Sequence, residues 1–142
     1  MFNRGLAVLG VCVLVLSVGL FVPRSSALAQ SIEVKTYGGV SYMSGGIGLD
    51  EREALEMMGR NYNLKLIFAV RQGNYLSDVK VVITGTGGNI ALEAVSDGPW
   101  FYAQLPPGTY RVSATTLGKM ITKTAHVGSG THTQLNFTWS NY

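Results

Sequence analysis

The chain has 142 residues and a formal net charge of +3 at pH 7, from 11 lysines and arginines against 8 acidic residues. Arg4 and Arg24 fall within the first 29 residues and no acid does, so the other 113 residues carry a net charge of only +1. Without a basic cluster to neutralise phosphates, nucleic acid is not expected as a partner. The single cysteine, Cys12, also lies in the first segment, so the remainder is expected to fold as one domain without disulfides.

Residues 1–29 have the pattern of a secretory signal peptide. Arg4 provides a basic start, residues 5–22 are apolar apart from Ser17, and Ala-Leu-Ala at 27–29 is a small-residue cleavage site. We therefore expect cleavage after Ala29 and export to the periplasm or the cell exterior, with no membrane attachment afterwards. A retained anchor helix is the alternative, because the eighteen residues 5–22 just suffice to reach across a bilayer.

A glycine-rich segment and a helix are expected next. Residues 30–48 contain five glycines in their second half and predict an irregular arm with one or two short strands. Residues 49–62 predict a short helix packed on the domain, with Asp50 as N-cap, Glu53 completing a capping box and Leu49 stapling the first turn. The apolar stripe of this helix is formed by Ala54, Leu55 and Met58.

Residues 63–142 read as strands separated by Gly, Pro, Asn and Asp turn signals. Runs rich in β-branched and aromatic residues recur every eight to twelve residues, which is typical of an antiparallel sandwich. In the run 109–116, Tyr110, Val112 and Ala114 share one face, as a half-buried strand requires. The seven expected strands lie within 63–70, 78–84, 90–95, 99–105, 109–116, 120–127 and 131–139.

Two turns carry the clearest local chemistry. Asp97-Gly98 is a tight-turn pair in which the glycine is expected to adopt a positive φ. Pro106 and Pro107 fix φ and remove backbone donors, so no strand continues through them, and Gly108 lets the chain reverse. We therefore expect both sites to be structural turns, the second one a hairpin between two core strands.

The order of these residues resembles the carboxypeptidase regulatory-like domains, within the wider prealbumin-like (transthyretin-like) sandwiches. The resemblance covers about residues 64–139 and implies a mainly β fold: an antiparallel prealbumin-like (Ig-like) sandwich of about seven strands after one short helix. It implies an accessory, structural, carbohydrate-binding or protein-binding module, and fold alone assigns no activity. Residues 42–70 are also similar to small exported bacterial proteins of unknown role. The residues that carry the main resemblance are Val79, Val81, Ile83, Asp97, Gly98, Leu105, Pro106, Pro107, Gly108, Tyr110 and Val112.

Two relatives of that group have chemistry that this chain does not match well. Pilin repeats form a Lys–Asn isopeptide bond beside a buried carboxylate, but here Gln104 stands at the acid position and Arg71 at the lysine position, with Asn136 as the asparagine. The related hydrolase of urate breakdown ends in Tyr-Arg-Gly-Ser, whereas this chain ends in Trp-Ser-Asn-Tyr at 139–142. Neither activity is expected.

His126 and His132 are the only histidines, and they flank the Gly-Ser-Gly turn at 128–130. In a hairpin they would approach each other across neighbouring strands, which makes them weak candidates for a metal site or an acid/base pair. Zinc normally takes three or four ligands, and no cysteine or nearby carboxylate accompanies them. Two solvated histidines are the favoured interpretation, with no metal and no cofactor.

Trp100 and Tyr102 alternate with Phe101, so they lie on the opposite face of their strand from it. An exposed aromatic pair on a sandwich binds a sugar ring or a partner chain, which makes these two residues the candidate binding residues. The alternative is that the arm or the helix covers them. The sequence thus predicts a non-enzymatic exported module that binds a protein or a glycan of the cell envelope. The alternatives are a structural envelope component paired through its edge strands, or a metal-binding or hydrolytic protein that uses the two histidines.

Overall fold

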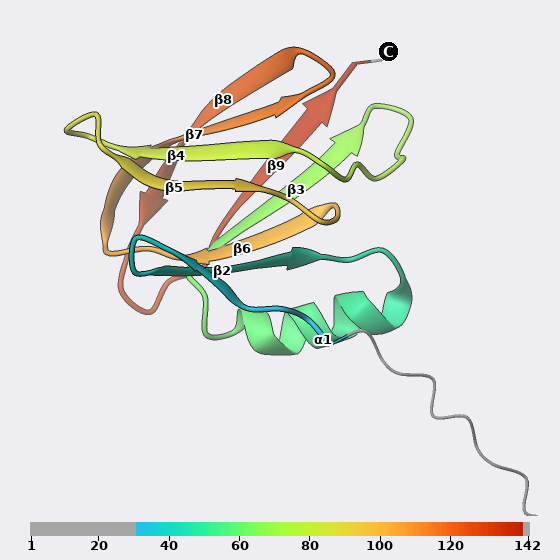
Figure 1. The fold of residues 1–142 in the computed structure, drawn as a ribbon, viewed down its shortest axis with the longest axis horizontal. Helices are drawn as coiled ribbons and strands as arrows, with labels where there is room; N and C mark the ends of the chain where they lie inside the picture. Colours follow the sequence, from blue (N-terminus) through green and yellow to red (C-terminus); the bar gives the residue numbers. More distant parts are fainter. Residues whose placement is uncertain (1–30, 141–142) are drawn as a thin grey trace, which may run out of the picture.

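Two β-sheets and one short helix make up the computed structural model, which describes residues 31–140 (Figure 1). The arrangement is mainly β and consistent with a β-sandwich; the expected signal peptide lies outside the described residues. No helix in residues 31–140 has the length and hydropathy needed to span a bilayer. The elements in chain order are β1 (Lys35–Tyr37), β2 (Val40–Gly45), α1 (Leu49–Gly59), β3 (Leu64–Val70), β4 (Lys80–Gly85), β5 (Ile90–Val95), β6 (Trp100–Gln104), β7 (Gly108–Thr116), β8 (Lys119–Val127) and β9 (Thr133–Trp139).

The strands divide between the sheets in the orders β1-β2-β6-β3-β9, here sheet A, and β5-β4-β7-β8, here sheet B. Each of the seven segments expected to be extended contains one strand. The expectation that all pairs are antiparallel is wrong for one of them, because β9 runs parallel to β3 from Leu64↔Thr133 to Val70↔Trp139. The chain crosses from sheet B to sheet A after β8, so β9 arrives beside β3 in the same direction.

The core lies between the sheets and follows the alternation seen in the sequence. Strand β3 buries Leu64, Leu66, Phe68 and Val70 and turns the intervening residues to the other face. In β7 the inward positions are Tyr110, Val112 and Ala114, as predicted. Three fully buried phenylalanines from β3, β6 and β9 fill much of the space between the sheets: Phe68, Phe101 and Phe137.

The glycine-rich arm is more regular than expected. Strands β1 and β2 form a hairpin whose turn residues, Gly38 and Gly39, both have positive φ, a conformation that glycine adopts without steric cost. Strand β2 then pairs with β6 from Ser41↔Gln104 to Gly45↔Trp100 and so becomes a member of sheet A. The arm therefore belongs to the sandwich.

Helix α1 lies against the outer face of sheet A (Figure 1) and begins at Leu49, as expected, but its N-terminal capping differs from the prediction. Its N-cap is Gly48, without a side-chain cap, and Asp50 lies in the first turn, so the expected capping box is wrong. Leu49 is 69% exposed and staples nothing. The helix ends at Gly59, within the expected segment 49–62. Leu55 is its one fully buried side chain, packed with Met43, Tyr62 and Tyr102.

Both structural turns connect one sheet to the other, so the expected hairpin at Pro106-Pro107-Gly108 is wrong. This segment carries the chain from β6 in sheet A to β7 in sheet B. The Tyr110 hydroxyl donates a hydrogen bond to the Pro106 carbonyl oxygen at 2.6 Å, which holds the corner closed. Such a tyrosine, bonded to backbone a few residues upstream, is a recurrent device at sandwich corners.

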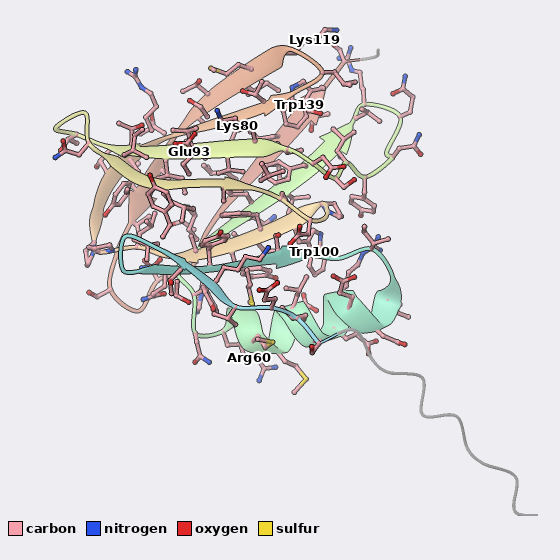
Figure 2. The ribbon with its side chains drawn as sticks, viewed as in Figure 1. Arg60, Lys80, Glu93, Trp100, Lys119 and Trp139 are labelled. Carbon is pink, nitrogen blue, oxygen red and sulfur yellow. The ribbon has the colours of Figure 1, made fainter. Side chains whose placement is uncertain are left out.

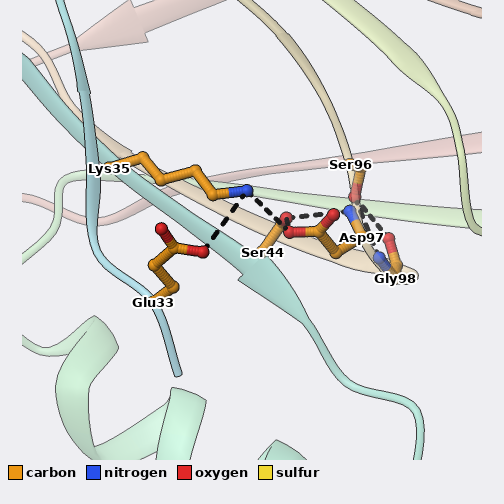
Figure 3. Close-up of polar contacts among 6 residues, drawn as sticks. All are labelled: Glu33, Lys35, Ser44, Ser96, Asp97 and Gly98. Carbon is orange, nitrogen blue, oxygen red and sulfur yellow. Dashed lines mark hydrogen bonds and ion pairs between the residues drawn. The ribbon is translucent and has the colours of Figure 1, made fainter. Parts of the chain in front are cut away.

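The Asp97-Gly98 segment carries the chain from β5 to β6, and the expected positive φ at Gly98 is wrong. Gly98 is needed for space, because a Cβ atom there would overlap the backbone of Gly45. Polar contacts also hold this segment close to β1 and β2 (Figure 3). The Asp97 amide donates to the Ser44 hydroxyl at 2.9 Å, and the Lys35 ammonium lies 3.1 Å from the Asp97 carboxylate. This ion pair holds the pKa of Lys35 above its ordinary value.

Side chains close one lateral edge of the sandwich. Strands β8 and β9 belong to different sheets, yet the Thr133 hydroxyl donates to the His126 carbonyl at 2.7 Å and the Trp139 indole donates to the Lys119 carbonyl at 3.1 Å. Lys123 adds a bond from its ammonium to the Asn136 carbonyl. Backbone acceptors that an edge strand would leave open are thereby satisfied.

Candidate functional site

The two candidate binding residues lie on the outer face of sheet A, where α1 covers them. Tyr102 is only 4% exposed and Trp100 is half-buried; Figure 2 labels Trp100 near the layer between sheet and helix. Of the two possibilities that the sequence left open, an exposed pair or a pair covered by the arm or the helix, the structure shows Tyr102 covered and Trp100 partly covered. What remains accessible is a cleft beside Tyr102, at the C-terminal end of the helix.

Close contact between the helix and Tyr102 defines one wall of this cleft. A Cβ atom at Gly59 would overlap the Tyr102 ring, so only glycine lets the last helical turn lie directly on the ring. The Tyr62 ring meets Tyr102 edge-on, with centroids 6.2 Å apart. Glycine at the helix end thus positions both tyrosines.

Asn63 anchors the segment that joins the helix to β3. Its side-chain amide donates to the Leu105 carbonyl at 2.6 Å, and its oxygen accepts from the Leu105 amide at 2.9 Å. The Asn63 carbonyl also accepts from the Thr133 amide at 2.9 Å. These bonds fix the start of β9 beside the helix end and hold the floor of the cleft in place.

The cleft has a volume of about 250 Å³ and a mixed polar and apolar wall. Donors and acceptors converge on it from α1, from β3 and β6, and from the start of β9. Its lining residues are Glu56, Gly59, Arg60, Tyr62, Asn63, Leu64, Lys65, Tyr102, His132, Thr133 and Gln134.

The Tyr102 hydroxyl is the most unusual group in the cleft. It is buried and has no hydrogen-bond partner within residues 31–140. Burial, with a smaller contribution from the Glu56 carboxylate, raises the pKa of this phenol to about 12. A buried polar group without a partner costs stability.

Like Arg60, Lys65 brings a positive charge to the lining of the cleft. Its ammonium lies 3.8 Å from the centroid of the Trp100 ring and 5.4 Å from that of Tyr102, so it makes cation–π contacts with both. Burial lowers the pKa of Lys65, and the Glu56 carboxylate partly opposes that shift. No carboxylate within residues 31–140 forms an ion pair with this ammonium.

The histidines do not meet as the hairpin interpretation expected. His126 lies on β8 in sheet B, whereas His132 precedes β9 in sheet A, because the turn at 128–130 is a crossing between sheets. His132 lines the cleft and donates from Nδ1 to the Tyr62 carbonyl at 2.8 Å, which leaves Nε2 as an acceptor in the neutral ring. No group of three or more metal-binding side chains is found within the described residues.

The isopeptide candidates are not brought together either. Gln104 pairs with Ser41 on β2, and Asn136 pairs with Ile67 on β3, and both side chains are exposed. Arg71 is exposed after the end of β3. The buried polar residues of the described chain are Asn63 and Ser96, neither of which is a carboxylate.

Sequence reasoning missed Lys65, Asn63 and Glu56. Lys65 carried a usable signal, since it is the one charged residue in the otherwise apolar run 64–70. Asn63 is the first residue of the expected extended segment 63–70 and Glu56 lies in the expected helix, and neither position carries a local pattern that indicates a site. No protein-family model matches the chain, and no curated protein matches it.

The raised pKa of Tyr102 predicts a specific loss of stability at alkaline pH. The unfolded phenol ionises near pH 10, whereas the folded one stays protonated to about pH 12, so the folded state binds more protons between these values. Stability from this group is complete below pH 10 and falls as the pH rises through 12, by about 2 kcal/mol. Urea unfolding at pH 8, 10 and 11 should show a smaller alkaline loss in Tyr102→Phe; equal losses in both proteins would contradict the assignment.

Proposed function

We propose that this protein is an exported, non-enzymatic β-sandwich module that binds a carbohydrate in the cleft beside Tyr102. Export is supported by the signal-peptide pattern of residues 1–29. A prealbumin-like topology is supported by the order β6-β3-β9 in one sheet and β5-β4-β7-β8 in the other, together with the Pro-Pro-Gly corner. The proposed binding rests on the cleft beside Tyr102.

The observation that carries the proposal is the Tyr102 hydroxyl, which has no hydrogen-bond partner within residues 31–140. A sugar hydroxyl both donates and accepts hydrogen bonds. The hydroxyls of one sugar can therefore bond to a phenol, an imidazole acceptor and a carboxylate that lie in one small space. Tyr102, His132 and Glu56 are such groups, and the rings of Tyr62 and Tyr102 supply the aromatic part of the cleft lining. The volume of about 250 Å³ suits a single sugar unit.

The test uses Tyr102→Phe, which removes the hydroxyl and keeps the ring. Stability should rise by about 1 kcal/mol, because a buried group without a partner disappears. Affinity for the saccharide should fall about fivefold, because one hydrogen bond worth about 1 kcal/mol is lost. The readout is amide chemical-shift change at Gly59, Tyr62 and His132 during titration with chitotriose, cellotriose and maltotriose.

Tyr110→Phe is the matched control, since it makes the same chemical change at a tyrosine whose hydroxyl is bonded to the Pro106 carbonyl. This variant should lose about 1 kcal/mol of stability and bind as the wild type does. If none of the three saccharides shifts the cleft amides, or if Tyr102→Phe binds as tightly as the wild type, the proposed function is wrong.

One observation supports the alternative of a structural envelope component. The edge formed by β8 and β9 is closed by side chains, whereas β5 is the edge of sheet B with Ile90 and Val95 about half exposed. An open edge of this kind pairs with a strand of another chain. Loss of self-association or partner binding in a β5 proline variant that leaves saccharide binding unchanged would favour this second function.

A further inference from the structure

A second hollow lies on the outer face of sheet B, near the turn that joins β4 to β5. Its volume is about 350 Å³, and it is separate from the cleft, since the two share no lining residue. Strands β4, β7 and β8 and the glycine-rich turn line it. The lining residues are Thr84, Gly85, Thr86, Gly88, Thr109, Tyr110, Arg111 and Thr124.

Arg111 is the single charged residue among those that line the hollow. The strand register places it directly between Thr84 of β4 and Thr124 of β8, so a guanidinium stands in a row with two hydroxyls. Arg111 is exposed and forms no ion pair with any residue in 31–140. A guanidinium that stands among hydroxyls and has no acidic partner in the described residues can donate hydrogen bonds to an incoming anion.

The acids on the same face of sheet B do not reach this array. Glu93 lies opposite Val82, in the next outward row, and its carboxylate is 3.3 Å from the Lys80 ammonium, as their neighbouring positions in Figure 2 illustrate. On the opposite side of Arg111 from Glu93, the Thr109 hydroxyl is 3.2 Å from Nδ1 of His126. Among residues 31–140, the hollow is thus lined by neutral donors and acceptors around the Arg111 guanidinium, which has no ion-pair partner there.

We propose that this hollow binds an acidic sugar, with the carboxylate of a uronic acid paired to Arg111 and its ring hydroxyls bonded to the surrounding threonines. The planar guanidinium donates two parallel bonds to a carboxylate, which fixes the orientation of the sugar. Each threonine hydroxyl both donates and accepts, as sugar hydroxyls require. The site lies on the opposite sheet from the cleft and goes beyond the neutral-saccharide function proposed there.

The experiment titrates the purified protein with glucuronate, with glucose and with inorganic sulfate, and follows the amides of Thr84, Thr109 and Thr124 by NMR. Glucose differs from glucuronate only at C6, where it has a hydroxymethyl group in place of the carboxylate. Sulfate supplies negative charge without the sugar ring. Glucuronate should bind at least tenfold more tightly than either, and its affinity should fall as NaCl is raised.

Arg111→Gln keeps hydrogen-bonding capacity and removes the charge, so the tenfold preference for glucuronate over glucose should disappear. Lys80→Gln is the matched control on the same face and should leave that preference intact. Equal binding of glucuronate and sulfate, or of glucuronate and glucose, overturns the proposal, as does an unchanged preference in Arg111→Gln. Tyr102→Phe should leave glucuronate binding at this hollow unaltered, so failure here and failure of the cleft are separate results.

Discussion

Replacing Phe68 with alanine should lower the free energy of unfolding by about 3–5 kcal/mol, a large fraction of what a domain of this size has. Phe68 is fully buried on β3, which is paired on both sides in sheet A, with β6 and with β9. Its ring centroid lies 5.8 Å from that of Phe137 and 6.3 Å from that of Trp139. Both neighbours come from β9, which pairs with the same strand, so neither ring can move far enough to fill the cavity.

Urea unfolding monitored by tryptophan fluorescence and by far-ultraviolet circular dichroism measures this loss. Met120→Ala is the control, because Met120 lies on an exposed position of β8 with 65% of its surface accessible. Its effect should stay within about 0.5 kcal/mol. A Phe68→Ala protein as stable as the control would contradict the core described here.

Gly98→Ala should lower the free energy of unfolding by about 3 kcal/mol, because the added methyl group meets backbone instead of a movable side chain. The atoms it would overlap are the carbonyl oxygen, carbonyl carbon and Cα of Gly45 on β2. Relief requires that the crossing between the sheets move away from β2. That movement also stretches the bond from the Asp97 amide to the Ser44 hydroxyl.

Gly87→Ala is the matched control for this second prediction. A Cβ atom at Gly87 has only the Asn89 side chain near it, at 4.0 Å, so the same substitution should change stability by less than about 0.5 kcal/mol. The test is to unfold both variants with a chemical denaturant and to compare the midpoints of their unfolding curves. Equal midpoints would show that the crossing does not approach β2 as closely as described.

Much of the local structure was predictable because it depends on short-range pattern. The alternation in the run 109–116 and the apolar run 64–70 placed their strands within a few residues, and Pro106-Pro107 marked a chain break. The helix was predictable as an element, but its cap was not. Asp50 and Glu53 have the spacing of a capping box, yet the chain enters the helix at Gly48 because the preceding glycines lead directly out of β2.

The candidate site was predictable only in part. Trp100 and Tyr102 were recognised as sharing one face of a strand, which the pleat requires. That α1 covers this face depends on the contact of Gly59 with the Tyr102 ring, and Gly59 carries no pattern that names its partner. The roles of Lys65 and His132 arise from segments far apart in the sequence that meet at one cleft.

By itself the sequence predicted seven of the strands to within a few residues and which of their faces are apolar, since these follow from composition and period along the chain. Only the tertiary structure decided which sheet each strand joins, that β9 runs parallel to β3, and that the tyrosine hydroxyl beside Gly59 is left without a partner. The physical reason is that pairing and burial are set by contacts between residues distant in the chain, and a local pattern fits several such partners equally well.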